Sequence, residues 1–254
     1  MKHIVKRGVD HGYNNINLPK GTREVVDIDT EFQKIKNEYD CYISTDKGDL
    51  LKSFIFEKDN KKYLIPIPDL SLVYFDAAYN LNQQRCHYEK ETLVPFNNNL
   101  KFNNIDFDNI YKYYGYSSSC LITLFTSLEC FINHLIPNDG IYQKNEKLFS
   151  KVFNQDQIQR GINFIDKVDQ VLPHLNGKKS FFKVFPKQTH HLKNLQKLRD
   201  DIVHTKSSLN HKKQQELIRR ILKFDFDKTF ESVKDFMNYY KTDFIEECKC
   251  GIDY

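Results

Sequence analysis

The chain contains no tryptophan, and its 254 residues include only 2 methionines, 9 glycines and 7 prolines. Apolar residues never run uninterrupted for about 18 positions, so no membrane-spanning helix is expected. The basic residues at the start of the sequence are not followed by the apolar segment of a secretory signal, and the cytoplasm is the expected compartment. The 6 cysteines form no CxxC pair. We expect reduced thiols, including Cys248 and Cys250, for which a soft-metal site is the less favoured alternative.

Aromatic residues are abundant by contrast, with 20 phenylalanines and 15 tyrosines, and Asn, Lys and Ile are frequent as well. These residues have AT-rich codons, so we interpret the bias as genomic. The hydrophobic fraction of 40% together with 28% charged residues excludes an intrinsically disordered chain, a collagen and a simple coiled coil. The length allows one large domain or two small ones, with a core that needs no disulfide or metal.

The formal net charge is +4, from 38 basic and 34 acidic residues, and the isoelectric point is about 8.5. This is less basic than the value above about 9 that is typical of a nucleic-acid-binding domain. The charge therefore allows contact with RNA but does not require it. The sequence has no Gly-rich phosphate loop, no GxSxG and no HExxH, the common signatures of nucleotide-binding proteins, serine hydrolases and zinc proteases.

Residues 1–68 are predicted to form a small β-rich N-terminal segment. Three stretches within it are rich in β-branched and aromatic residues, and the turn-like sequences DKGD and EKDN separate them. This pattern predicts a short antiparallel hairpin or a three-stranded meander, with Pro66 and Pro68 ending the last strand at a sheet edge. The three expected strands are 39–45, 50–56 and 61–67.

Residues 69–254 are predicted to form an all-α domain. The expected fold class is therefore mainly α: a bundle of about five helices after a small β-containing segment. Asp69 is the expected N-cap of the first helix, and Ser117–Ser119 and Pro137–Gly140 are expected to begin and end the second. The segment 96–112 is expected to be a polar connection. The expected helices are 69–91, 118–136, 155–175, 187–206 and 226–245, with a shorter one at 211–222.

Apolar residues recur at helical spacing in these segments and predict the faces that are buried. On the first helix the expected face is Leu70, Val73, Tyr74, Ala77 and Leu81. On the second it is Leu121, Leu124, Phe125, Leu128, Ile132 and Leu135, and on the third Ile158, Ile162, Ile165, Val168 and Leu172. The fourth has Leu192, Leu195, Leu198 and Ile202, and the fifth has Phe226, Phe230, Val233, Phe236 and Tyr240.

The fourth helix carries the most informative sequence of the chain, LRDDIVH at 198–204. On an ideal helix Asp200 and His204 share a face at i, i+4, next to the buried leucines. Arg199 lies at the border of the buried face, about 140° from His204. The two therefore do not converge within one straight helix. They need the length of the Arg199 side chain, a local distortion or a second copy of the helix to meet at one site.

The second helix offers matching polar groups in the sequence SLECFIN at 127–133. Glu129 and Asn133 are spaced i, i+4, and both fall beside the apolar stripe rather than opposite it. If the second and fourth helices pack through their leucine faces, these two side chains approach the edge that carries Arg199 and His204.

Together, LRDDIVH and SLECFIN resemble the sequence pattern of HEPN-domain ribonucleases, which have an RX4–6H motif. Here the motif is Arg199 and His204, and the polar residue after the Arg, usual in that family, is Asp200. The resemblance covers about residues 69–245 and leaves the N-terminal third unmatched. It implies a helical bundle that forms a homodimer with two motifs facing one cleft. It also implies RNA cleavage without metal or cofactor, to 2′,3′-cyclic phosphate and 5′-hydroxyl ends, in toxin–antitoxin, abortive-infection or CRISPR-linked defence.

The residues of the motif suit this reaction. Attack of a ribose 2′-hydroxyl on its own phosphate needs a proton acceptor and a proton donor near neutral pH, and His204 can serve as both. The forked guanidinium of Arg199 can hold two phosphate oxygens as negative charge develops. Asp200 is expected to orient His204 or favour its charged form, Glu129 to hold Arg199, and Asn133 to contact the RNA backbone. DNA lacks the attacking hydroxyl and is not an expected substrate.

Simpler interpretations exist for the same residues. An exposed Arg beside Asp is often a solvated ion pair of small energetic value, and a His at a helix end often complements the helix dipole. The alternative function is a catalytically silent helical module that binds RNA, nucleotide or a protein partner. An antitoxin or regulatory protein is a further expected partner. The basic residues 211–213 with Arg219 and Arg220 are interpreted as a solvated helix face, with electrostatic guidance of RNA as the alternative.

Overall fold

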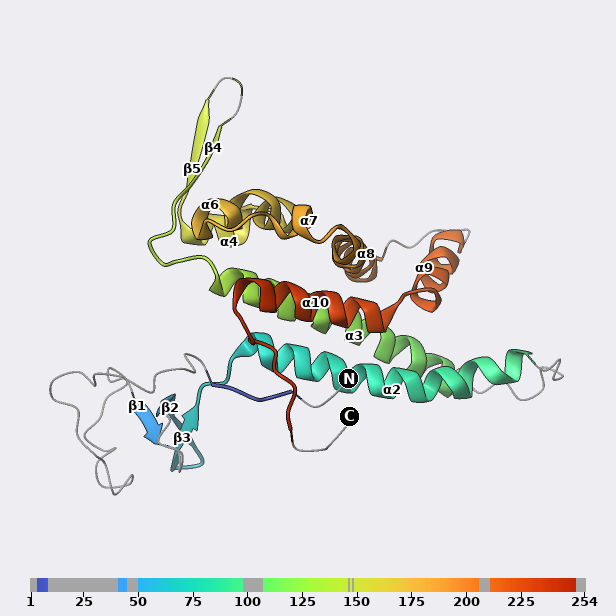
Figure 1. Ribbon diagram of the computed structural model, residues 1–254. Coiled ribbons are helices and arrows are strands. Elements are labelled where there is room, and N and C mark those ends of the chain that lie inside the picture. The colour runs from blue at the N-terminus through green and yellow to red at the C-terminus, as the bar shows by residue number, and fades with distance from the viewer. Residues whose placement is uncertain are drawn as a thin grey trace. The chain divides into compact units, whose positions relative to one another are not determined.

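The computed structural model in Figure 1 describes residues 4–8, 41–44, 50–97, 107–145, 147, 149–205 and 211–249. The chain divides into two compact units. The sheet unit is Lys6–Val73, and the helical unit is Met1–Val5 together with Tyr74–Tyr254. The fold is mainly α with a small N-terminal β segment, as the sequence predicts.

The sheet unit contains the expected three-stranded antiparallel meander, in the order β1-β2-β3. The hairpin between β2 and β3 turns at Asp59 and Asn60, whose φ angles of 53° and 59° are those of a type I′ turn. Pro66 ends the edge strand, where it pairs with Ser53 and its missing N–H costs little. The expected turn at 46–49 lies outside the described residues. The strands are β1 Cys41–Ser44, β2 Leu50–Lys58 and β3 Lys61–Pro66.

All the expected helical regions are present. They are α2 Leu70–Asn97, α3 Phe107–His134, α4 Gln155–Gly161, α5 Phe164–Asp166, the π-helix η2 Lys167–Val171, α6 Leu172–Asn176, α7 Phe181–Val184, α8 Pro186–Val203, α9 Lys212–Leu222 and α10 Phe226–Tyr240. No helix among the described residues is both long and apolar enough to cross a bilayer.

The core of the helical unit forms where α3, α8 and α10 pack on one another (Figure 1). The predicted α3 face is confirmed, because its first five members are buried and only Leu135 is partly exposed. The predicted faces of α8 and α10 are confirmed as well, with Ile202 of α8 half-buried. Phe236 of α10 lies at the centre, with ring centroids 6.2 Å from Phe131 and 5.0 Å from Phe181.

The predicted buried face of the first helix is wrong. Leu70 and Val73 are exposed, and the buried face includes Leu72, Phe75, Ala78 and Tyr79. The Phe75 and Tyr79 rings pack edge-on against Phe230 at 5.6 and 5.4 Å, which fixes the rotation of the helix. Three polar residues on the same face, Ser71, Asn82 and Arg85, hide its period in the sequence.

The ends of the first two helices also differ from expectation. Asp69 is the expected N-cap, since its Oδ1 accepts a 2.9 Å hydrogen bond from the Ser71 N–H. The helix then runs on to Asn97, and α3 begins as early as Phe107, so both ends of the expected connection 96–112 are helical. Residues 98–106 lie outside the described residues. Ser117 is no cap, because it lies inside α3, where its hydroxyl donates to the Tyr113 carbonyl oxygen at 2.7 Å.

The expected third helix is broken into four pieces. The chain leaves helical geometry at Ile162, and Asn163 starts the next turn by accepting a hydrogen bond from the Asp166 N–H. This restart changes the helix phase, so Ile162 and Ile165 are only half-buried and Phe164 and Lys167 are buried instead. A π-helical turn then follows from Lys167 to Val171. Gly177, with φ of 66°, ends α6 close to the expected end of the third helix at 175.

A second hairpin, which the sequence did not predict, precedes α4 and extends away from the helices in Figure 1. Its strands are β4 Tyr142–Asn145 and β5 Ser150–Phe153. Their composition, with Lys144 opposite Lys151, lacks the apolar alternation that signals a strand.

The packing of α2 on α10 gives a stability prediction. Phe230→Ala removes the ring that Phe75 and Tyr79 contact, and it should lower the free energy of unfolding by about 3–5 kcal/mol because a cavity remains. Urea denaturation measures the loss. Tyr111→Ala, on an exposed site of α3, is the matched control and should change stability by less than about 0.5 kcal/mol. Equal losses in the two variants would contradict the α2–α10 contact.

Candidate functional site

The helix α8 carries the LRDDIVH sequence at its C-terminal end. Leu192, Leu195 and Leu198 are buried and hold the helix against its neighbours, so Arg199 follows directly after the core. The helix ends at Val203. The last i→i−4 hydrogen bond runs from the His204 N–H to the Asp200 carbonyl oxygen at 2.9 Å, and His204 itself leaves helical geometry.

The guanidinium of Arg199 is held on three sides. Its Nη2 donates to Glu129 Oε2 on α3 at 3.2 Å, and its Nη1 pairs with Asp200 Oδ1 at 3.0 Å. The Cζ atom lies 4.1 Å from the centroid of the Phe125 ring, at the distance of a cation–π contact. The side chain is only 22% exposed. Contacts on both edges and one face fix the position and plane of the fork.

Glu129 reaches Arg199 from the neighbouring helix, as the packing of leucine faces predicts. Partial burial raises the pKa of its carboxyl group above the ordinary value. The charges of Arg199 and Lys167 lower this pKa, and the charge of Asp200 raises it. The charge of this carboxylate therefore depends on two cations from different elements.

Lys167 is the member of this cluster that sequence reasoning missed. It is buried in the π-helix η2, and its Nζ donates to the Gln159 carbonyl oxygen at 2.6 Å and to Asn133 Oδ1 at 3.3 Å. Desolvation lowers the pKa of its ammonium group, and the charge of Glu129 opposes that shift. A lysine inside an apolar helical segment was the available signal. An unbroken helix from Ile158, however, would have placed Lys167 opposite the predicted apolar face.

Asn133 belongs to the Lys167 side of the cluster. Its amide oxygen accepts from Lys167, and its backbone carbonyl accepts from Gln159 Nε2 at 3.2 Å. No hydrogen bond joins Asn133 to Arg199 or His204 among the described residues. It ties α3 to the α4–η2 segment and so supports Glu129, one turn earlier on the same helix.

His204 is exposed at the end of α8, and its ring has no hydrogen bond or ion pair within the part of the chain that the structure describes. The Asp200 carboxylate pairs with Arg199, and no hydrogen bond links it to the His204 ring. Within one chain Arg199 contacts both Glu129 and Asp200, whereas no hydrogen bond or ion pair among the described residues joins the His204 ring to them.

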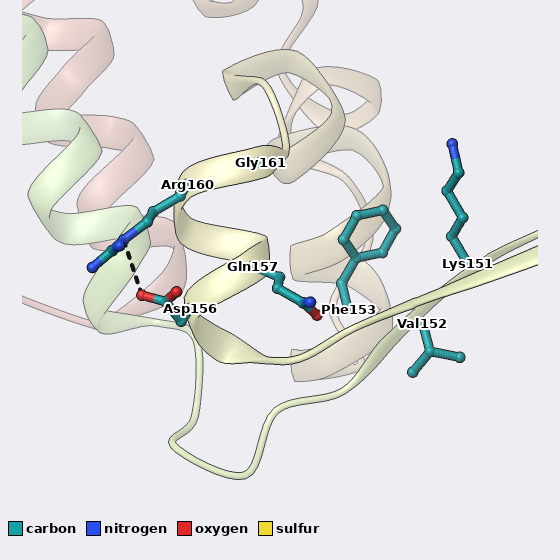
Figure 2. Close-up of a pocket in the computed structure, with 7 residues that line it drawn as sticks. All are labelled: Lys151, Val152, Phe153, Asp156, Gln157, Arg160 and Gly161. Atoms are coloured by element: carbon teal, nitrogen blue, oxygen red, sulfur yellow. Dashed lines mark ion pairs between the residues drawn. The ribbon is translucent and has the colours of Figure 1, made fainter.

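Other parts of the molecule are weaker candidates for a site. An open depression of about 490 Å³ lies where β5 meets α4, and Figure 2 shows Arg160 in it, paired with Asp156 at 3.0 Å. It contains no histidine and none of the residues singled out from the sequence. Among the described residues, no three His, Cys, Asp or Glu side chains gather closely enough to hold a metal ion. The Arg199 cluster is the stronger candidate.

The raised pKa of Glu129 gives a prediction for the pH dependence of stability. Between the ordinary value of 4.5 and its higher folded value, the native state holds a proton that the unfolded chain has lost, so the contribution of Glu129 to stability falls as pH rises. The free energy of unfolding of the wild type, minus that of Glu129→Gln, should therefore decrease through this window in urea titrations. Glu216→Gln, on an exposed site of α9, is the control and should give a flatter difference. A difference for Glu129→Gln that increases with pH would contradict the desolvation of this carboxyl group.

The cluster thus joins one fixed guanidinium, two carboxylates and a buried ammonium group across α3, η2 and α8, beside an exposed imidazole. Such a set can bind a phosphate and exchange protons. Comparison of the chain with protein-family models, with curated proteins and with solved structures finds no match.

Proposed function

We propose that this protein is a metal-independent endoribonuclease of the HEPN type. It cleaves RNA to 2′,3′-cyclic phosphate and 5′-hydroxyl ends in the cytoplasm, as a homodimer, in bacterial antiphage defence or as a toxin. The observation that carries the proposal is the fixed guanidinium of Arg199, held by Glu129, Asp200 and Phe125 at the end of the helix that exposes His204.

The proton transfers need one histidine for each reacting phosphate. His204 accepts the proton of the ribose 2′-hydroxyl while the 2′-oxygen bonds to phosphorus. The bond from phosphorus to the 5′-oxygen breaks, and that oxygen takes the proton from the same His204. The products are a 2′,3′-cyclic phosphate and a 5′-hydroxyl, and His204 returns to its starting protonation state.

Arg199 stabilises the charge that develops on the phosphate. One of its five N–H donors is used in a hydrogen bond to Glu129, and Nη1 forms an ion pair with Asp200, so further donors remain for phosphate oxygens. Because the guanidinium is already fixed, little side-chain entropy is lost when the phosphate binds. Glu129 and, through it, Lys167 and Asn133 are positioning residues for this group.

A homodimer accounts for the separation of Arg199 and His204 on one helix. On an ideal helix the two side chains would point about 140° apart, and His204 is exposed, so a partner chain can reach it. A two-fold interface repeats every contact, so two copies of the motif can contribute to one cleft.

Cleavage of RNA should proceed without a metal ion and should depend on His204 and Arg199. Purified protein with EDTA should cleave RNA, and His204→Ala should lower the rate by about 10²-fold or more because general acid–base catalysis is lost. Arg199→Lys, which keeps the charge but removes the fork, should lower it by roughly tenfold to a hundredfold. The matched controls are His190→Ala, exposed on the same helix, and Arg160→Lys, exposed on α4. Intact RNA with the wild type between pH 6 and 8.5 would contradict the proposal.

Mixing two inactive variants tests whether Arg199 of one chain acts with His204 of the other chain. Mixed and re-equilibrated Arg199→Ala and His204→Ala chains should recover about a quarter of the wild-type activity, because half the dimers are mixed and each then has one intact Arg–His pair across the interface. Either variant alone should stay inactive. No recovery in a mixture shown by sedimentation to contain dimers would mean that Arg199 and His204 do not act across chains.

The alternative is a catalytically silent module of the same kind. It would bind RNA, nucleotide or a protein partner with the Arg199 cluster intact, and it would leave RNA uncleaved in both experiments. Overexpression in a bacterial host distinguishes the two, because toxicity of the wild type that Arg199→Ala relieves is expected only of the nuclease.

A further inference from the structure

The net charge of the protein is concentrated in one short segment. Residues 211–223, which include α9, hold five basic residues and one acidic residue, a net charge of +4 that equals the net charge of the whole chain. The rest of the sequence therefore contains 33 basic and 33 acidic residues and is neutral overall. The net charge of the whole chain therefore comes from one strongly basic helical segment.

This helix is nearly all surface. Within α9 only Ile221 is buried, and Lys213, Arg219 and the following Lys223 are exposed. No ion pair joins these three cations to a carboxylate among the described residues. Arg219 and Lys223 are also spaced i, i+4, where like charges repel each other and destabilise the helix end. Uncompensated cations at this spacing favour an anionic ligand over a purely structural role.

An ion pair places the basic helix beside the candidate site. Arg220 of α9 pairs with Asp201, which follows Asp200 in LRDDIVH, and α9 packs on both α8 and α3. Asp201 lies two residues before the end of α8 at Val203, so this contact is at the C-terminal end of the helix, which His204 follows. The exposed cations of α9 therefore lie next to the motif rather than at a distant surface.

We infer that the exposed face of α9, through Lys213, Arg219 and Lys223, binds the phosphate backbone of single-stranded RNA next to the Arg199–His204 site. The inference rests on the proposed function for the identity of the polymer. The regularly spaced phosphates of a nucleic-acid strand fit cations that are spread along a helix. Lys213 and Arg219 are spread in this way, with the uncharged Gln214 and Gln215 between them. An acidic protein partner fits less well, because Ile218 is the one large apolar side chain exposed on this helix and protein interfaces have an apolar centre.

The test measures binding without cleavage, in the full-length His204→Ala background. Lys213→Gln, Arg219→Gln and Lys223→Gln are combined, and the Kd for a labelled single-stranded RNA is measured by fluorescence anisotropy at several salt concentrations. Three lost phosphate contacts should reduce the slope of log affinity against log salt by about 2, at roughly 0.7 per contact on a single strand. Affinity at low salt should fall at least about tenfold, and Arg219→Gln alone should show about a third of the slope change.

The matched control removes the same charge from the other end of α8. Lys179, Lys183 and Lys187 are exposed, and Lys187 lies about 24 Å along the helix axis from the end at Val203. Their combined change to Gln should leave the slope nearly unchanged. Equal slopes for the two triple variants, or an unchanged slope for the α9 variant, would overturn the inference and leave an acidic protein as the partner of this face.

The two proposals fail in different ways. If the α9 triple variant binds RNA with an unchanged salt slope while the wild type cleaves RNA, only the inference about α9 is rejected. Salt-dependent binding through α9 with no cleavage by the wild type rejects the nuclease and retains the RNA-binding face.

Discussion

The packing of α3 against α8 determines where the guanidinium of Arg199 lies. Leu195 and Leu198 bury one side of α8, and the residue that follows them is Arg199, whose Cζ lies 4.1 Å from the ring of Phe125 on α3. A half-exposed ion pair contributes little free energy, so the Glu129 contact alone could not hold a long side chain in one place. Apolar burial brings the helices together, and the ion pairs then select one orientation of the fork.

The charges around Arg199 alternate in sign across three elements. Arg199 on α8, Glu129 on α3 and Lys167 on η2 form a chain in which the carboxylate lies between two cations. Lys167 is buried and keeps hydrogen bonds to the Gln159 carbonyl oxygen and to Asn133. The break at Ile162 and Asn163 is what directs it inward, because α5 restarts the helix phase there and Lys167 then follows the buried Phe164 by three residues. An irregular backbone segment thus supports a site whose reacting groups lie on other helices.

The sequence predicted those parts of the structure in which burial follows a simple helical period. The faces of α3, α8 and α10 are apolar stripes, and the Glu129–Arg199 contact followed from packing two of them together. The face of α2 failed because Ser71, Asn82 and Arg85 are buried in it, with Arg85 satisfied by Asn82, Glu89 and the ring of Phe226. Such pairing depends on tertiary partners that the local pattern does not reveal. The break at Ile162, which restarts the helix phase, also hid Lys167.

The electrostatic field at the end of α8 depends on α9. The C-terminal end of a helix carries a partial negative charge, and α8 adds two carboxylates there, Asp200 and Asp201. Arg199 neutralises the first and Arg220 neutralises the second. What remains is the negative end of the helix dipole, which repels a phosphate, and the exposed cations Lys213, Arg219 and Lys223, which attract one. Several full charges outweigh about half a charge, so α9 gives this end of the molecule its positive sign.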